Sequence, residues 1–143
     1  ACDIRICSDN SVFAIPAGRL GIAYRPNFTR WVAEVVGAST TKEILFTARR
    51  YDAAEALQLG LVNRVTSVDE LAGYVLDYAQ SITENAPLSV RATKAIVNII
   101  GDSPGEWDRD KMEEFIDACS NSEDYIEGRR AYMEKRTPEF KGK

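Results

Sequence analysis

Hydrophobic and polar positions divide the chain into a short extended beginning and a longer helical remainder. Residues 2–7 alternate apolar with charged positions, which is the period of a half-buried strand, and Val12-Phe13 is a second short apolar run after turn residues. From residue 40 onward, apolar residues recur instead at steps of three and four, the spacing of one helix face. The pattern therefore predicts strands first and helices afterwards.

Residues that cap helices predict where these helices begin and end. Thr40–Glu43 and Ser67–Glu70 both have the sequence of a capping box, in which a hydroxyl and a glutamate satisfy the first free amides. Asp52 is expected to open a short helix that ends at Gly60, because glycine readily takes the left-handed conformation after a helix. Pro87 is expected to start the next helix.

The last third of the chain carries three further signals of this kind. We expect Gly101 to break the helix that starts at Pro87, and residues 103–106 (Ser-Pro-Gly-Glu) to start the following one with an N-cap, an N1 proline and an N3 glutamate. Ser122 is expected to cap a last helix that runs to about Arg136. The tail, residues 137–143, is expected to be extended.

A long irregular loop is predicted between the second short strand and the first helix. This stretch, Phe13–Trp31, reads FAIPAGRLGIAYRPNFTRW and is punctuated by proline and glycine. Ala17 and Tyr24 are its most informative residues, for reasons that depend on a family resemblance described below.

Composition narrows the class of protein. The chain has 143 residues, of which 45% are hydrophobic and 28% charged, with a net charge of −4, as in an ordinary globular domain. We therefore expect no nucleic-acid partner held by a strong basic field. No apolar run approaches the length of a membrane span, so no membrane partner is expected. Three widely spaced cysteines do not indicate a disulfide framework, which favours a cytoplasmic location.

The chain contains no histidine, which removes imidazole acid–base catalysis, the Ser-His-Asp triad and histidine metal sites. No bound metal is expected. A lone strand over residues 2–7 could not satisfy its own backbone groups, so we expect the chain to begin in mid-fold, with further sequence upstream of Ala1.

Five segments, in family order and spacing, resemble the C-terminal half of the crotonase (enoyl-CoA hydratase/isomerase) superfamily. They are ACDIRICSDNSVF at 1–13, LGIAY at 20–24, KEILFTARRYDAAEALQLGLVNRV at 42–65, ENAPLSVRATKAIVN at 84–98 and SEDYIEGRRAYMEKRTPEF at 122–140. The resemblance implies an α/β fold: the end of a ββα spiral, residues 1–66 with an active-site loop at 13–31, followed by a mostly helical C-terminal trimerisation region, residues 67–143.

The resemblance also implies a chemistry. The substrate would be an acyl-CoA thioester of fatty acid metabolism, whose carbonyl oxygen lies between two backbone amides that stabilise an enolate. Those amides would lie upstream of this sequence. Coenzyme A would be present only as part of the substrate, with no permanently bound cofactor, and the protein would assemble as a homotrimer or as a hexamer formed from two trimers.

One departure from the family pattern puts hydratase activity in doubt. Family hydratases carry a glutamate in a Gln-Pro-Glu run at the place where this chain reads Ile15-Pro16-Ala17. A methyl group cannot transfer a proton, and general acid–base help is worth about 10²–10⁴-fold in rate. The Leu-Gly-x-x-Tyr run, the SEDYxEG segment and the KRxPxF tail are similar to methylmalonyl-CoA decarboxylases, which lack that glutamate and use a tyrosine at the position of Tyr24. Decarboxylation of a short 2-carboxyacyl-CoA is therefore favoured.

These considerations select candidate site residues. Tyr24 is the catalytic candidate, and its alternative is a loop tyrosine packed on a helix that starts near Asn27. Ala17 is expected in the substrate site, unless the loop register differs and Arg19 takes that place. Lys135 and Phe115 are candidates for contact with coenzyme A; their alternatives are a lysine favoured by the helix dipole and a core phenylalanine. The candidates for substrate binding are Pro16, Ala17, Leu20 and Gly21.

Three other functions stay open at this point. The chain could belong to a catalytically silent family member that binds acyl-CoA, or to an ordinary enoyl-CoA hydratase that uses upstream carboxylates. It could also be an independent helical interaction domain.

Overall fold

A computed structural model describes residues 2–102 and 105–143. The chain forms two compact units, Ala1–Leu76 and Asp77–Lys143, and helix α3 (Leu71–Thr83) runs from the first into the second. Each unit is described by itself below. The boundary expected from the sequence, between residues 66 and 67, stays a prediction.

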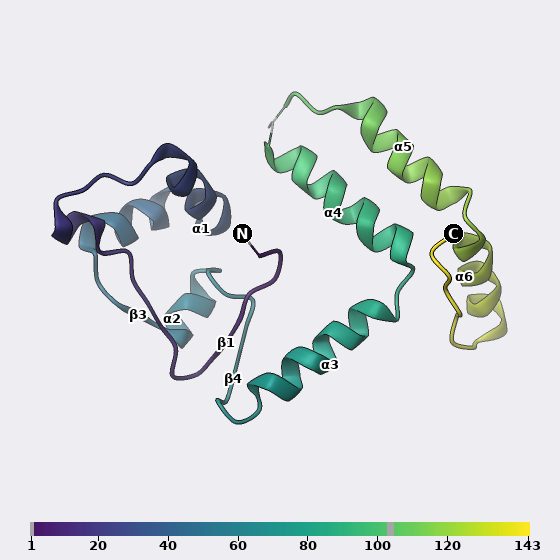
Figure 1. Cartoon of the computed structure of the whole chain (residues 1–143), viewed down its shortest axis with the longest axis horizontal. Helices are drawn as coiled ribbons and strands as arrows, with labels where there is room; N and C mark the ends of the chain where they lie inside the picture. The colour runs from purple at the N-terminus through teal and green to yellow at the C-terminus, as the bar shows by residue number, and fades with distance from the viewer. Residues whose placement is uncertain (1, 103–104) are drawn as a thin grey trace. The chain divides into compact units, whose positions relative to one another are not determined.

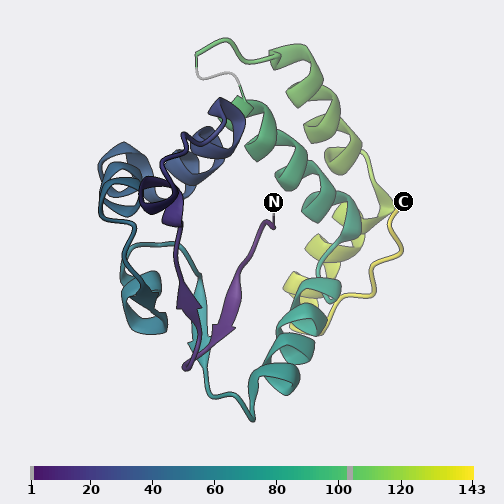
Figure 2. The same cartoon turned by 60° about the vertical axis from the view of Figure 1, so that its left-hand side comes forward.

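Two small sheets build the first unit. Strand β1 (Ile6–Ser8) pairs in parallel with β4 (Arg64–Thr66), so that Cys7 lies opposite Val65 (Figure 2). Strand β2 (Val12–Phe13) pairs antiparallel with β3 (Tyr51–Asp52). The predicted strand at 12–13 is confirmed. The first strand starts at Ile6, later than the alternating pattern over 2–7 predicts.

Arg5 explains the late start of β1. Its side-chain Nε donates to the carbonyl of Leu61 at 2.6 Å, and its Nη1 donates to the carbonyl of Cys2 at 3.0 Å. Its own backbone N–H donates to the side chain of Asn63 at 2.8 Å instead of to a strand. The backbone before β1 is thus held by these side-chain contacts together with one backbone hydrogen bond, in which the N–H of Asn63 donates to the carbonyl of Arg5 at 2.7 Å.

The core of the first unit lies between these strands and helix α2 (Ala53–Gln58). Small side chains dominate it because a short helix has to approach the strands closely. Asp52 caps α2 by accepting from the backbone N–H of Glu55 at 2.8 Å, and Gly60 follows at φ 75°, as predicted. The buried members of the core are Cys7, Ala53, Ala56 and Val62, with Phe13, Leu61 and Val65 packed against them.

Helix α1 (Pro26–Thr47) starts earlier than the predicted capping box at 40–43, and that prediction is wrong. The backbone leaves helical geometry at Gly37, where φ is 79° and ψ is 161°. Thr41 lies inside the helical segment that follows, and its hydroxyl donates back to the carbonyl of Gly37 at 2.8 Å. A glycine, which alone tolerates this conformation easily, therefore divides α1 where no cap was expected.

An arginine joins the end of α1 to β3 and α2. The guanidinium of Arg49 lies 3.7 Å from the ring centroid of Tyr51, which is buried. It also pairs with Glu55 at 2.6 Å and with Glu43 at 3.5 Å. The hydrogen bond to Glu55 is the main reason why the pKa of Arg49 is raised. These contacts keep the chain between α1 and α2 in one conformation.

Helices and one extended tail form the second unit. Helices α4 (Pro87–Asp102) and α5 (Arg109–Ser120) lie side by side, and α6 (Glu123–Glu134) follows (Figure 1). Helix α4 ends at Asp102, one residue after the break predicted at Gly101. Asp108 caps α5 by accepting from the backbone N–H of Lys111 at 3.0 Å.

The start signal at 103–106 does not coincide with the start of α5. Ser103 and Pro104 lie outside the described residues, and Gly105 and Glu106 precede the helix. Two other capping predictions are confirmed. The N–H of Glu70 donates to Ser67 Oγ at 3.3 Å, and the N–H of Tyr125 donates to Ser122 Oγ at 3.0 Å. The Ser67 hydroxyl in turn donates to the Glu70 carboxylate at 2.6 Å, which lowers the pKa of Glu70.

Two carboxylates of α6 hold the extended tail against the helix. Asp124 is buried, with 3% of its surface exposed, and its oxygens accept the backbone N–H groups of Lys141 at 2.6 Å and Gly142 at 2.8 Å. Glu127 accepts from Arg136 Nη1 at 2.6 Å and from the N–H of Glu139 at 3.0 Å. These bonds, the one from Arg136 first, lower the pKa of Glu127 to about 2.

The length and apolar content of each helix decide whether it could cross a membrane. Among the described residues, none of the helices is both long enough and apolar enough for a membrane crossing.

Candidate functional site

A short 3-10 helix, η1 (Pro16–Leu20), occupies the middle of the stretch that was predicted to be irregular. Ile15 is extended, Pro16 takes the first helical position, and Gly21 ends the turn at φ 66°. The N–H of Ile22 donates to the carbonyl of Ala17 at 3.1 Å. The loop prediction for 13–31 is therefore wrong over η1, whereas α1 begins at Pro26, next to the helix start expected near Asn27. The four substrate-binding candidates, Pro16, Ala17, Leu20 and Gly21, belong to this turn and its cap.

η1 packs against the C-terminal end of α1. A methyl group built on Gly18 would lie 3.1 Å from the carbonyl oxygen of Leu45, so the two backbones approach closely. Ala17 beside it is buried, with 5% of its surface exposed, whereas Leu20 is 65% exposed. The turn therefore presents Leu20 outward and keeps the Ala17 methyl among packed atoms.

Tyr24 lies between η1 and α1 and begins a row of aromatic rings. Its ring centroid is 6.2 Å from that of Phe28, edge to face, and Phe28 is 5.4 Å from Trp31 in the same arrangement. Tyr24 is 38% exposed, and within the described part of the chain no group hydrogen-bonds to its hydroxyl. The ring is thus fixed by packing while the hydroxyl keeps its capacity to bind a ligand.

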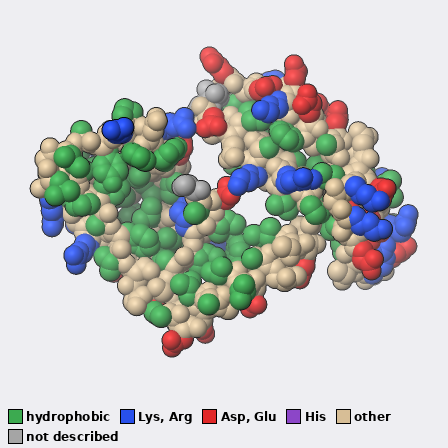
Figure 3. Space-filling view, viewed as in Figure 1, with side chains coloured by type: hydrophobic (Ala, Val, Ile, Leu, Met, Phe, Trp, Pro, Cys, Tyr) green, Lys and Arg blue, Asp and Glu red, His purple; other side chains and the backbone are tan. Residues whose placement is uncertain are grey.

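Apolar side chains are exposed along this part of the first unit. Figure 3 shows hydrophobic side chains gathered on the face of that unit turned to the viewer. The exposed members from η1 to the middle of α1 are Leu20, Ile22, Tyr24, Phe28, Trp31 and Val35.

All charged side chains in segment 13–31 are positive. It contains three arginines, Arg19, Arg25 and Arg30, and no aspartate or glutamate. Arg30 pairs with Glu34 at 3.1 Å. Arg19 and Arg25 are exposed and form no ion pair with any described residue. The local electrostatics therefore favour an anionic ligand over a cationic one.

The candidates for contact with coenzyme A lie in the second unit, on different elements. Lys135 is exposed at the end of α6, in the left-handed conformation at φ 56°. Phe115 is half-buried on α5. Neither residue lines the groove described next.

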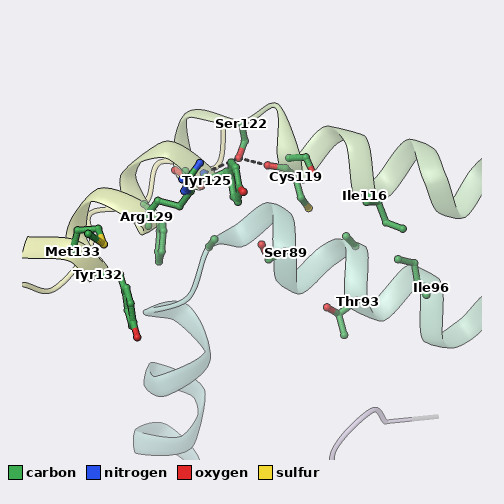
Figure 4. A pocket seen from close by; sticks show the side chains of 16 residues that line it. Ser89, Thr93, Ile96, Ile116, Cys119, Ser122, Tyr125, Arg129, Tyr132 and Met133 are labelled. Carbon is green, nitrogen blue, oxygen red and sulfur yellow. Dashed lines mark hydrogen bonds between the residues drawn. The ribbon is translucent and has the colours of Figure 1, made fainter. Parts of the chain in front are cut away.

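The sequence did not point to a groove between α4, α5 and α6. Its cavity volume is about 680 Å³, and Figure 4 shows side chains from all three helices around it. The residues repeat at helical spacing, such as Ser89, Thr93 and Ile96 on α4, and Tyr125 and Arg129 on α6. In the sequence, this spacing indicates one face of each helix, but it does not indicate that the three helices pack together.

Over the described residues, no group of three or more cysteine, aspartate and glutamate side chains could hold an ion.

Comparison with known proteins now places the chain. A family model described as enoyl-CoA hydratase/isomerase matches residues 1–143, and the chain belongs to this family. It is 35% identical to carnitinyl-CoA dehydratase of Citrobacter koseri, over 100% of this chain and 56% of that protein. It is 34% identical to the probable mitochondrial enoyl-CoA hydratase 2 of Arabidopsis thaliana, over 99% of this chain and 47% of that protein.

Solved structures agree with the family assignment. The crystal structure of an enoyl-CoA hydratase subunit from Geobacillus kaustophilus superimposes with a TM-score of 0.88 at 33% identity, covering 99% of this chain and 55% of the other. The expected mixed α/β, mostly helical fold of the crotonase type is thereby confirmed. The chain spans about half the length of the curated relatives it matches.

Proposed function

We propose that the protein processes acyl-CoA thioesters through a stabilised thioester enolate, without a carboxylate at position 17. The observation that carries this proposal is Ala17, a buried methyl group within η1, where the family resemblance leads one to expect a glutamate. Two backbone amides, which the resemblance assigns to sequence upstream of this chain, would hold the thioester oxygen.

Decarboxylation of a short 2-carboxyacyl-CoA is the reaction that these residues favour. The bond between C2 and the carboxylate breaks, its electron pair passes into the thioester enolate, carbon dioxide leaves, and C2 then takes a proton. No strong base is required. What helps is a neutral donor that orients the carboxylate and a positive field around it, which Tyr24 and the arginines of segment 13–31 could supply.

Hydration or dehydration is the second candidate, and the relatives favour it. Two of them are named carnitinyl-CoA dehydratase and enoyl-CoA hydratase. For this protein to act as such a lyase, its carboxylates would have to come from positions other than 17.

Side-by-side assays separate the two candidates. Full-length protein would be supplied with methylmalonyl-CoA and with crotonyl-CoA, and product formation measured for each. We expect carbon dioxide release from the first and only weak hydration of the second. Robust hydration of crotonyl-CoA without decarboxylation would reverse the assignment, and binding of both thioesters without turnover would support a silent acyl-CoA-binding member.

Tyr24→Phe tests the tyrosine. Because the ring is already held by Phe28, we expect the fold to be unchanged and decarboxylation to fall about 10- to 100-fold, the equivalent of one hydrogen bond to a charged group. Tyr132→Phe, which removes an exposed hydroxyl from α6, is the matched control. Equal turnover in Tyr24→Phe and the unaltered protein would leave Tyr24 with a packing role only.

We also propose that Lys135 and Phe115 contact coenzyme A. The variant Lys135→Gly tests this contact and, at the same time, the effect of the backbone conformation of Lys135 on stability. Lysine in the left-handed conformation is strained, so glycine should raise the free energy of unfolding by about 0.5–1 kcal/mol. It should also raise KM for the thioester. Ala48→Gly, at φ 46°, is the control that relieves similar strain away from the proposed contact. An unchanged KM would leave only the capping role.

The remaining expectations are proposals about the whole protein. We propose a cytoplasmic enzyme that assembles as a homotrimer or a dimer of trimers. Sedimentation of full-length protein as a monomer at micromolar concentration would contradict the assembly.

A further inference from the structure

The residue that follows helix α6 has a backbone conformation that lysine rarely adopts. Lys135 is left-handed at φ 56°, and its N–H donates to the carbonyl of Tyr132 at 3.3 Å. The N–H of Arg136 donates to the carbonyl of Ala131 at 3.0 Å, which completes the C-terminal cap of the helix. In a residue other than glycine, such a conformation persists only where the surrounding structure enforces it.

The side chain of Arg136 supplies this enforcement. Its Nη1 and Nη2 donate to the two carboxylate oxygens of Glu127 at 2.6 Å and 3.0 Å, the paired arrangement that fixes direction as well as distance. Its Nε donates to the carboxylate of Glu134 at 2.7 Å. Arginine can make these bonds together because its guanidinium is a rigid, planar fork of donors.

Glu127 also holds the chain that comes after Lys135. Its carboxylate accepts the backbone N–H of Glu139 at 3.0 Å, and Arg136 Nη1 donates to the carbonyl of Thr137 at 3.2 Å. The bonds from Arg136 and from Glu139 lower the pKa of Glu127 to about 2, so this carboxylate is ionised at neutral pH. The tail therefore turns back beside α6 (Figure 1), and the backbone is fixed on both sides of Lys135.

This arrangement leaves the ammonium group of Lys135 available. The side chain is exposed, and among the residues that the structure describes it forms no ion pair. Glu134, the carboxylate beside it in the chain, is paired with Arg136 instead. A lysine on a fixed backbone suits the binding of a phosphate, because less conformational entropy is lost when the ligand binds.

We propose that Glu127 and Arg136 are positioning residues for coenzyme A, which hold the backbone of Lys135 so that its ammonium group meets a phosphate of the thioester substrate. This inference rests on the contact between Lys135 and coenzyme A proposed above. Glu127 and Arg136 do not touch the substrate themselves, and both act through Lys135.

Isothermal titration calorimetry of the full-length protein with butyryl-CoA tests this role. A saturated thioester without a second carboxyl group is neither hydrated nor decarboxylated, so the measurement does not depend on the reaction catalysed. Glu127→Gln keeps the size of the side chain but removes its charge. It should bind butyryl-CoA about 5-fold more weakly, the equivalent of ordering the backbone of one residue on binding.

Glu123→Gln is the matched control for this variant. Glu123 lies at the other end of α6, where it pairs with Lys143 of the tail at 3.4 Å. The control should bind butyryl-CoA as the unaltered protein does. Circular dichroism establishes that each variant is folded.

A double-mutant cycle distinguishes positioning from a general loss of structure. Lys135→Ala removes the ammonium group and should itself weaken binding. In that background Glu127→Gln should have no further effect on Kd, because the group that it positions is gone. An equal loss of affinity in both backgrounds would show a merely structural role and would overturn the inference.

Arg136→Lys is the second variant. It keeps the positive charge but cannot make two parallel bonds to Glu127, so it should also weaken binding. Tighter binding by Glu127→Gln would mean that the released Arg136 contacts coenzyme A directly, and it would refute the positioning role.

The same measurements separate this inference from the proposed function. If the unaltered protein does not bind butyryl-CoA, the proposed function fails and the positioning role with it. If Lys135→Ala binds as well as the unaltered protein, the contact with coenzyme A is absent and there is nothing to position. If Lys135→Ala binds weakly while Glu127→Gln and Arg136→Lys bind normally, the contact stands and the positioning role alone is refuted.

Discussion

Replacing Ala17 with glutamate is expected to raise hydration of crotonyl-CoA by about 10²-fold or more in the full-length protein, and to lower decarboxylation of methylmalonyl-CoA. The new carboxyl group would stand on η1, where the resemblance places the family's acid–base group, and general acid–base help is worth about 10²–10⁴-fold. A negative charge beside a substrate carboxylate would also repel it. Spectrophotometric assay of both thioesters measures the two effects.

Ala17→Gln is the matched control for this change. It has almost the same volume but cannot transfer a proton, so it should lower decarboxylation without raising hydration. If Ala17→Glu and Ala17→Gln hydrate crotonyl-CoA equally slowly, the side chain at position 17 does not face the reacting carbons, and the proposed function loses its main support.

The Ala17→Glu variant should also acquire a pH-dependent stability. Because Ala17 is buried, the pKa of the new carboxyl group should be raised in the folded state above its unfolded value of about 4.3. The folded state then binds the proton more tightly than the unfolded state. The variant should therefore be nearly as stable as the parent below that unfolded pKa, and progressively less stable as the pH rises through the folded pKa. Thermal unfolding across this range checks the sign.

The variant Asp124→Ala is expected to be much less stable than the unaltered protein, and this is the second large effect. The buried carboxylate accepts two backbone N–H groups of the tail, and its removal leaves both donors without their partner. Hydrogen bonds to charged groups contribute about 1.5–3 kcal/mol each, and the effects of neighbouring bonds overlap. We expect the free energy of unfolding to fall by about 2–4 kcal/mol, measured by urea titration followed by circular dichroism.

Glu123→Ala is the control for the tail anchor. Glu123 precedes Asp124 in α6, but it is exposed, and among the residues that the structure describes its ion-pair partner is Lys143 at 3.4 Å. A surface change of this kind should alter stability by about 0.5 kcal/mol or less. If Asp124→Ala is no less stable than Glu123→Ala, the tail is not held by the buried carboxylate.

Features that depend on residues close together in the sequence could be predicted. Asp52 and Ser122 cap their helices as expected, because each cap and the amide it binds are three residues apart. Gly101 marks the end of α4 to within one residue, since the helix ends at Asp102. Gly37, which does interrupt α1, carries no distinguishing signal in the sequence.

Features that depend on distant residues could not be predicted. The bonds from the tail to Asp124 join positions 17 and 18 residues apart, with a helix between them. The groove beside Arg129 requires three helices, and no single pattern specifies how these meet. Within the candidate site, Pro16 and Gly21 were read as loop residues, although together they provide the beginning and the end of η1.

The close approach of Gly18 to the carbonyl of Leu45 limits how this protein could be re-engineered. Libraries intended to change acyl preference could vary the exposed Leu20 most freely, whereas larger side chains at the buried Ala17 would have to displace packed atoms. A Cβ at position 18 would lie 3.1 Å from the Leu45 carbonyl oxygen, so η1 and α1 would have to separate by a few tenths of an ångström. Such a shift would be passed on to positions 17 and 20 of the same turn, so glycine is best kept at position 18 when its neighbours are varied.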